Sequence, residues 1–223
     1  MDKNLLALEK HLGNFRVSGE LPEHLLVPTD WQPLVGLTDK DKVKSVISLW
    51  EKNCVGAFSV LLGVFQKRLE NVHLLEIDSK PALLYTFRNP KGDYLHYVGY
   101  TPLPSLQLPT GTKNLPWPAT FSEYYRNVHN GWYEVESQAL GLLPQDEFFW
   151  LSEKEWGILD EISIEFSLDK VLAVFSNGAG GYLCWNFNTV EPSGVVWWDD
   201  EAPDGVDFWD ILDEWSAMGI EEC

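Results

Sequence analysis

An apolar segment, a tight turn and a second apolar segment follow one another between Leu83 and Tyr100, and this order predicts a β-hairpin. The turn is Asn89-Pro90-Lys91-Gly92-Asp93, which separates residues 83–88 from residues 94–100. Asn and Gly tolerate positive φ and Pro fixes its own φ, so residues of these types favour tight turns. A hairpin pairs its two strands antiparallel, which constrains the sheet that the chain can form.

A second turn of this kind lies in the carboxyl-terminal half. Asn177-Gly178-Ala179-Gly180-Gly181 predicts a tight turn between strands at 171–175 and 182–187. A phosphate-binding glycine loop would lead from a strand into a helix, whereas here a strand follows. Other apolar or alternating segments predict strands at 55–64, 72–77, 162–166 and 195–198.

Apolar residues at helical spacing predict helices with identifiable ends. Thr38-Asp39 is expected to cap a helix that carries residues 43–50. Residues 119–129 predict a helix that ends at Asn130-Gly131, with His129 near its end and interacting with the helix dipole. Further helical structure is expected at 5–12, 207–218 and, in part, 145–156.

These elements predict an α+β fold with a mixed or antiparallel sheet of about five to six strands and helices packed mainly on one face. Five prolines fall within residues 101–118 and indicate an extended connector. We therefore expect an N-terminal α/β region at 1–110 and a second domain at 111–223. The N-terminal region would add a second sheet or extend the first.

The charge of the chain is strongly divided. Residues 1–130 carry 14 basic and 13 acidic side chains, whereas residues 131–223 carry 2 and 21, which gives the net charge of −18. The second part also holds eight of the 11 tryptophans. Phosphates would be repelled by such a surface, which argues against direct nucleic-acid binding. A basic partner is one explanation, and solubility alone is the other.

No arrangement of residues predicts an enzyme. The chain lacks a G-x-S-x-G nucleophile elbow, and its five histidines and three cysteines are too scattered for a metal site. The acidic stretch after Trp198 fails as an EF-hand loop, because Ala202 and Ile211 occupy ligand positions. An irregular calcium site and a carboxylate pair of the glycosidase type stay open as alternatives. We expect no catalytic residue, no cofactor and no bound metal.

The localisation expected from the sequence is cytoplasmic. No apolar run approaches the roughly 18 residues that span a bilayer. The first ten residues include acidic side chains and no long apolar stretch, which is unlike a signal peptide. We therefore expect a soluble protein without membrane contact.

Three segments resemble the SUKH superfamily, which includes yeast cell-wall regulators and many bacterial immunity proteins. Residues 117–131 resemble its LP-x-x-Y-x-x-F-x-x-x-x-N-G helix, and residues 170–188 resemble its central hairpin. Residues 194–215 are similar to its closing strand, acidic loop and helix. The resemblance covers roughly residues 111–223, and residues 1–110 resemble no family.

The resemblance implies a non-enzymatic bacterial immunity protein that binds and neutralises a cognate polymorphic toxin, such as a secreted effector acting on nucleic acid or nucleotides. The charge division independently favours a basic partner. A regulatory scaffold that binds an endogenous protein is the alternative, and a glycoside hydrolase is a third possibility. The expected partner-binding residues are Trp197, Trp198, Asp199, Asp200, Glu201, Asp204, Asp207, Asp210 and Glu214.

Overall fold

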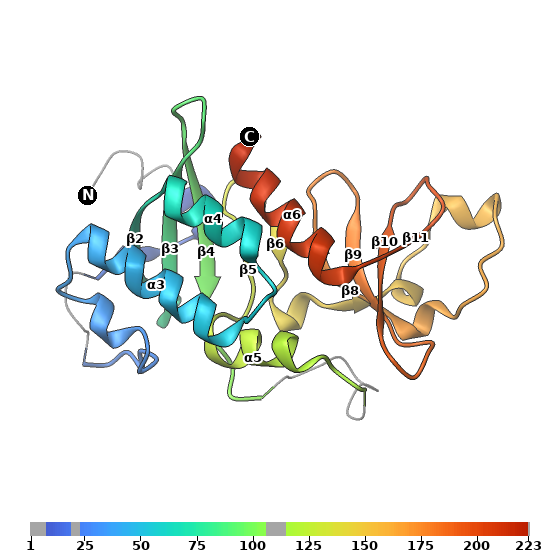
Figure 1. The fold of residues 1–223 in the computed structure, drawn as a ribbon, viewed down its shortest axis with the longest axis horizontal. Coiled ribbons are helices and arrows are strands. Elements are labelled where there is room, and N and C mark those ends of the chain that lie inside the picture. Colours follow the sequence, from blue (N-terminus) through green and yellow to red (C-terminus); the bar gives the residue numbers. More distant parts are fainter. Residues whose placement is uncertain (1–7, 19–22, 106–114, 223) are drawn as a thin grey trace.

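The computed structural model describes residues 8–18, 23–105 and 115–222, and its strands form one antiparallel sheet (Figure 1). The strand order is β1-β2-β3-β4-β5-β6-β8-β9-β10-β11, and β7 also pairs with β8. The strands are β1 (Phe15–Val17), β2 (Leu69–Ile77), β3 (Lys80–Arg88), β4 (Tyr94–Tyr100), β5 (Trp132–Glu134), β6 (Ala139–Leu142), β7 (Phe149–Trp150), β8 (Val171–Ser176), β9 (Tyr182–Asn186), β10 (Ser193–Trp197) and β11 (Asp204–Val206).

The α+β class is confirmed, but the expected five to six strands are too few, because the described residues contain eleven. The N-terminal part extends the same sheet through β5, whose Trp132 lies opposite Gly99 of β4. Strands as short as β5 and β6 leave little periodic signal in a sequence. The connector at 101–118 thus joins two parts of one sheet. Residues 106–114 of it lie outside the described residues, and the division at 110 remains a prediction.

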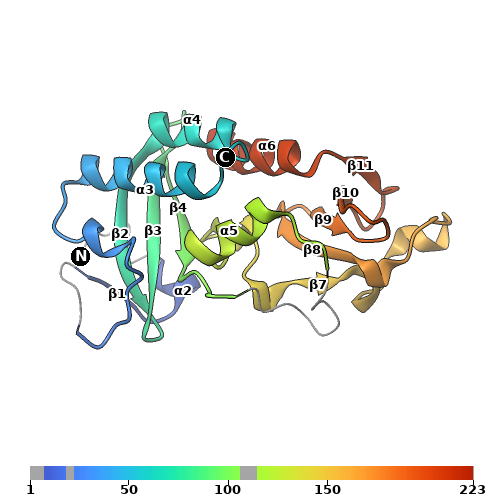
Figure 2. The same cartoon turned by 60° about the horizontal axis from the view of Figure 1, so that its bottom comes forward.

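Helices cover one face of this sheet along most of its length. Figure 2 shows α3, α4 and α6 above the sheet, with α5 beside them. The α-helices of the described residues are α2 (Glu9–Leu12), α3 (Asp39–Asn53), α4 (Ser59–Arg68), α5 (Ala119–Asn127) and α6 (Phe208–Glu221). The 3-10 helices there are η1 (Gln32–Leu34), η2 (Gln145–Glu147), η3 (Leu151–Glu153), η4 (Gly157–Asp160) and η5 (Leu168–Lys170).

Alternating side chains divide each strand between two cores. On β3, Tyr85 and Phe87 belong to the large core beneath the helices, while Leu84 belongs to a smaller cluster that includes Leu12 of α2. At the other end of the sheet, the far face is covered by the segment 151–168. Both faces of inner strands such as β3 and β8 are therefore buried, and these strands read as nearly continuous hydrophobic runs.

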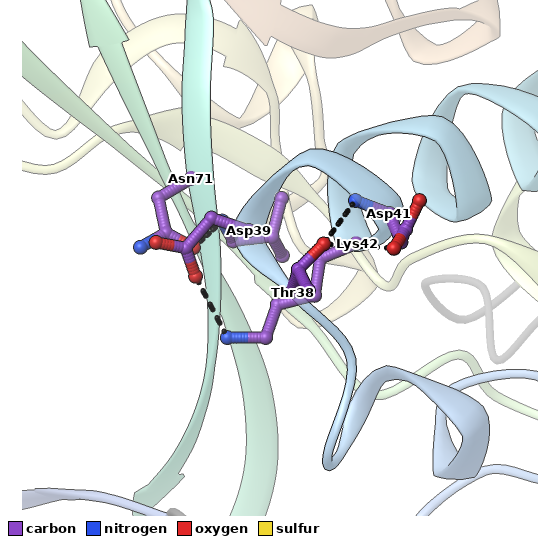
Figure 3. Close-up of polar contacts among 6 residues, drawn as sticks. Thr38, Asp39, Asp41, Lys42 and Asn71 are labelled. Carbon is purple, nitrogen blue, oxygen red and sulfur yellow. Dashed lines mark hydrogen bonds and ion pairs between the residues drawn. The ribbon is translucent and has the colours of Figure 1, made fainter.

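The expected N-terminal cap of α3 is present. The hydroxyl oxygen of Thr38 accepts a hydrogen bond from the backbone N–H of Asp41 at 3.3 Å (Figure 3). Lys42 Nζ lies 3.2 Å from Asp39 Oδ1 in the same first turn, beside Asn71 of β2. The carboxylates of Asp39 and Asp41 also stabilise this end of the helix, because the helix dipole is positive there.

The strand expected at 55–64 is wrong, because Ser59 begins helix α4. The first residue before the helix, Phe58, offers no side-chain cap. The cap comes from Asp213 of α6, whose carboxylate accepts hydrogen bonds from the N–H groups of Val60 and Leu61 at 2.8 and 2.7 Å. A residue so distant in the sequence could not be used to predict the helix start.

The strand expected at 162–166 is also wrong, because these residues form no strand pairing. Their alternation is nevertheless meaningful, since Ile162, Ile164 and Phe166 all pack against the core of this end of the sheet. The segment 145–156, expected to be partly helical, contains η2 and η3 with the short strand β7 between them.

His129 does not have the expected role at a helix end. It is fully buried, and burial lowers its pKa to about 3, so it carries no charge to interact with a dipole. Its Nε2 lies 2.6 Å from the hydroxyl of Tyr85, which in turn accepts a hydrogen bond from Trp50 Nε1. Its Nδ1 faces the backbone carbonyl of Tyr100 at 3.3 Å. This chain of bonds gives the buried polar groups of Trp50, Tyr85 and His129 partners inside the aromatic core.

Candidate partner-binding surface

The two neighbouring tryptophans at the end of β10 have different environments. Trp197 is fully buried and packs at 5.5 Å from the ring of Trp156. It is therefore a core residue and not the expected partner contact. Trp198 lies on the opposite side, is partly exposed, and contacts the ring of Trp215 on α6 at 6.2 Å. Adjacent residues in extended chain face opposite ways, which explains the split.

The loop between β10 and β11 carries three of the expected acids, all exposed. Asp199 also has a structural role, because its Oδ1 accepts from the Gly157 N–H at 3.2 Å and its carbonyl accepts from Ile158 N–H at 2.8 Å. Asp200 and Glu201 make no such bonds within the described residues. Of the three acids, these two are therefore the freer ones for contact with a partner.

The remaining expected acids follow along β11 and α6. Asp204 pairs with Val196 across the sheet edge and is exposed. Asp207 caps α6 by accepting hydrogen bonds from the N–H groups of the residues two and three positions on, at 2.9 and 3.1 Å. Asp210 and Glu214 are exposed one turn apart on the helix. The structure thus places these acids on consecutive elements at one end of the sheet.

Residues 131–223 hold 2 basic and 21 acidic side chains, so most of this negative charge has no base nearby in the sequence to neutralise it. Within the described residues, Arg68 of α4 pairs with Glu221 at 3.1 Å. Lys154 instead lies over the ring of Phe149, with its Nζ 3.7 Å from the ring centroid. An unbalanced field of one sign attracts counterions and cationic partners.

The sequence did not identify a groove beside α6. It has a volume of about 360 Å³ and is lined by Leu140, Asn177, Trp198, Trp215, Met218, Gly219 and Glu222. Met218, which lines the groove, is 47% exposed. Trp215 is partly exposed and borders this groove.

A larger cleft of about 600 Å³ lies on the other side of the molecule, near α2 and the β2–β3 turn. The hydroxyls of Tyr100 and Tyr133 lie 3.1 Å apart in it. Asp78, Asp146 and Glu147 also line it. Burial, with a smaller contribution from the Asp146 charge, raises the pKa of Glu147. A cleft with several carboxylates is the feature that a hydrolytic enzyme would use.

The described residues contain no cluster of three or more His, Cys, Asp or Glu side chains suited to a metal ion. Cys54 and Cys184 are both buried, and burial raises the pKa of Cys54 to about 12, which makes it a poor nucleophile. In the part of the chain that the structure describes, every helix is too short or too polar to cross a bilayer.

Comparisons with protein families, with curated proteins and with solved structures found no match to this chain.

Proposed function

We propose that this chain is an immunity protein of the SUKH type, which binds a cognate basic toxin and blocks its action without performing chemistry itself. The contact surface consists of the β10–β11 loop and the outer face of α6, which we call the acidic surface. It comprises Trp198, Asp199, Asp200, Glu201, Asp204, Asp207, Asp210 and Glu214, while Trp197 is left out because it is buried.

One observation carries this proposal. Exposed acids occupy consecutive elements beside the partly exposed Trp198, and no basic side chain of the described residues pairs with them. Tryptophan is among the residue types enriched at the energetic centres of protein interfaces. Unpaired carboxylates speed the capture of a cationic partner and can bind the lysines and arginines that a nuclease or a nucleotide-modifying enzyme uses for phosphate.

The experiment is co-expression of the chain with the product of the adjacent gene. We expect the two proteins to elute together and the chain to restore growth of cells that produce the adjacent protein. Independent elution together with unrelieved toxicity, or the absence of any toxicity, would contradict an immunity function.

A charge-reversal variant tests the surface itself. Replacing Asp200, Glu201, Asp204 and Glu214 with Lys leaves the structural carboxylates of Asp199 and Asp207 in place. We expect about 100-fold weaker binding of the adjacent protein and a shallower dependence on salt. The matched control replaces four exposed acids elsewhere, Glu23, Asp30, Glu51 and Asp93, and so makes the same change in net charge. Equal affinities for the two variants would remove the acidic surface from the interface.

The cleft near the β2–β3 turn favours one other function, a glycoside hydrolase. Its carboxylates include Glu147, whose raised pKa suits a general acid. Hydrolysis of aryl glycosides by the purified chain, lost in Glu147→Gln, would support this second function.

The alternative of a regulatory scaffold predicts a different result. The chain would then bind an endogenous protein stably, and no toxin gene would lie nearby.

A further inference from the structure

The groove beside α6 is formed by side chains that are already held in position. A Cβ atom at Gly181 would lie 2.7 Å from the ring of Trp198, so this glycine lets the indole approach the β8–β9 turn closely. Trp215 packs between Trp198 and Phe175, at 6.2 and 5.8 Å. A partner would therefore not have to order these two aromatic walls on binding, which removes part of the entropic cost.

The third side of the groove is held by an unusual backbone conformation. Leu140 has a φ of 55°, which a bulky side chain rarely adopts. A Cβ atom at Gly219 would lie 3.2 Å from the Cβ of Leu140, so α6 approaches β6 closely here. Leu140 and the exposed Met218 thus both contribute apolar lining to the groove.

Charge determines which partner fits this groove. Asp210, Glu214 and Met218 follow one another at four-residue intervals, so they form one exposed line along α6. At the Trp198 end, the chain continues directly into Asp199 and Asp200. Two bases lie beside the Glu222 end of the groove, and both are engaged: Arg68 pairs with Glu221, and Lys91 donates to the carbonyl of Glu222 at 3.1 Å.

We infer that the groove binds an apolar side chain carried by a lysine- and arginine-rich segment of the partner, while Asp210 and Glu214 bind the basic residues of the same segment. This inference rests on the proposed function, because it deepens the assignment of the acidic surface. It adds Trp215, Met218 and Leu140 to the contact surface, as the apolar lining of the groove that holds the partner's side chain. Apolar anchors inside a charged rim are the usual centre of a tight interface.

The chain contains two methionines, Met1 and Met218, so methyl-labelled methionine gives a direct probe of the groove. The probe ligand is a helical peptide with leucines on one side and lysines on the other. We expect this peptide to shift the Met218 methyl resonance, with the Met1 methyl as internal reference and Met218→Leu for assignment. A peptide with glutamates in place of the lysines should leave Met218 unchanged. Equal shifts with both peptides, or none with either, would overturn the inference.

A variant separates this inference from the proposed function. Met218→Lys places a positive charge at the groove, and we expect at least about tenfold weaker binding of both the lysine–leucine peptide and the adjacent gene product. The control is Val190→Lys, because Val190 is 91% exposed in the β9–β10 turn and does not line the groove. Full-strength binding of the adjacent gene product by Met218→Lys would refute the groove but leave the immunity function intact. Conversely, binding of the lysine–leucine peptide at Met218 without binding of the adjacent gene product would support the groove and refute the immunity function.

Discussion

The carboxylate of Asp213 on α6 accepts a hydrogen bond from the backbone N–H of Leu61 on α4 at 2.7 Å, across 152 positions of sequence. The same carboxylate accepts from the Val60 N–H and from the Ser59 hydroxyl. It therefore caps a helix other than its own. At the far ends of the two helices, Arg68 pairs with Glu221. These polar contacts fix the position of α6 and with it the groove and the acidic surface.

Replacing Asp213 with Ala should lower the free energy of unfolding by about 3 kcal/mol. The substitution leaves N–H groups of the first turn of α4 without acceptors in a partly buried environment. Asp213→Asn, which keeps one acceptor oxygen, should lose less. Urea unfolding measures both variants. Glu214→Ala, at the exposed neighbouring position, is the control and should change stability by less than about 0.5 kcal/mol. Similar losses at positions 213 and 214 would show that the cap contributes little.

Two helical glycines should respond in opposite ways to substitution by alanine. A Cβ atom at Gly219 would lie 2.6 Å from the Tyr97 hydroxyl, so Gly219→Ala should push α6 off the sheet and destabilise the chain by about 1–3 kcal/mol. At Gly63 of α4, a Cβ atom meets nothing within 4 Å. Gly63→Ala should therefore stabilise by up to about 1 kcal/mol through helix propensity. Thermal unfolding compares the two, and stabilisation by Gly219→Ala would disprove the close approach.

The buried His129 should make the fold sensitive to acid. Its pKa falls from 6.5 to about 3 on burial, so the unfolded chain binds a proton at higher pH than the folded chain does. Above about pH 6.5, His129 contributes nothing to the pH dependence of the free energy of unfolding. Between pH 6.5 and 3, stability should fall by about 1.4 kcal/mol for each pH unit through this group.

The variant His129→Gln isolates this contribution from that of the carboxylates. Chemical unfolding of both proteins across pH 4–8 should give a shallower decline for the variant below pH 6.5. Parallel curves for wild type and His129→Gln would mean that the buried imidazole does not titrate as described.

Short-range sequence patterns predict an element correctly where its turn or cap residues lie within the element or next to it. The turn at 89–93 predicted the β3–β4 hairpin, and Thr38 predicted the start of α3. They do not predict the start of α4, because the residue that caps this helix, Asp213, lies far away in the sequence. The segment 162–166, expected to form a strand, shows a second limit of such patterns. Its alternating residues do have a partly buried and an exposed side, yet alternation alone cannot supply a hydrogen-bonding partner.

The acidic part of the candidate surface followed from the sequence because carboxylates rarely lie inside a protein unpaired. The aromatic part did not. Two adjacent tryptophans must face opposite ways in a strand, but only the strand register determines which one is buried. In this sheet, Trp197 lies opposite Tyr182 and faces the core beneath the segment 151–168. Trp198 consequently faces α6.

The two tryptophans should therefore separate stability from binding. Trp197→Ala removes a fully buried indole and should cost about 3–5 kcal/mol of unfolding free energy. Trp198→Ala removes a partly exposed ring whose core-facing contacts are fewer, and we expect a loss below about 2 kcal/mol, with binding of the adjacent gene product weakened at least about tenfold. Urea unfolding and calorimetric titration measure the two effects. A Trp198→Ala protein that binds as wild type would exclude this indole from the interface, whereas equal stability losses would contradict the register that turns Trp197 inward.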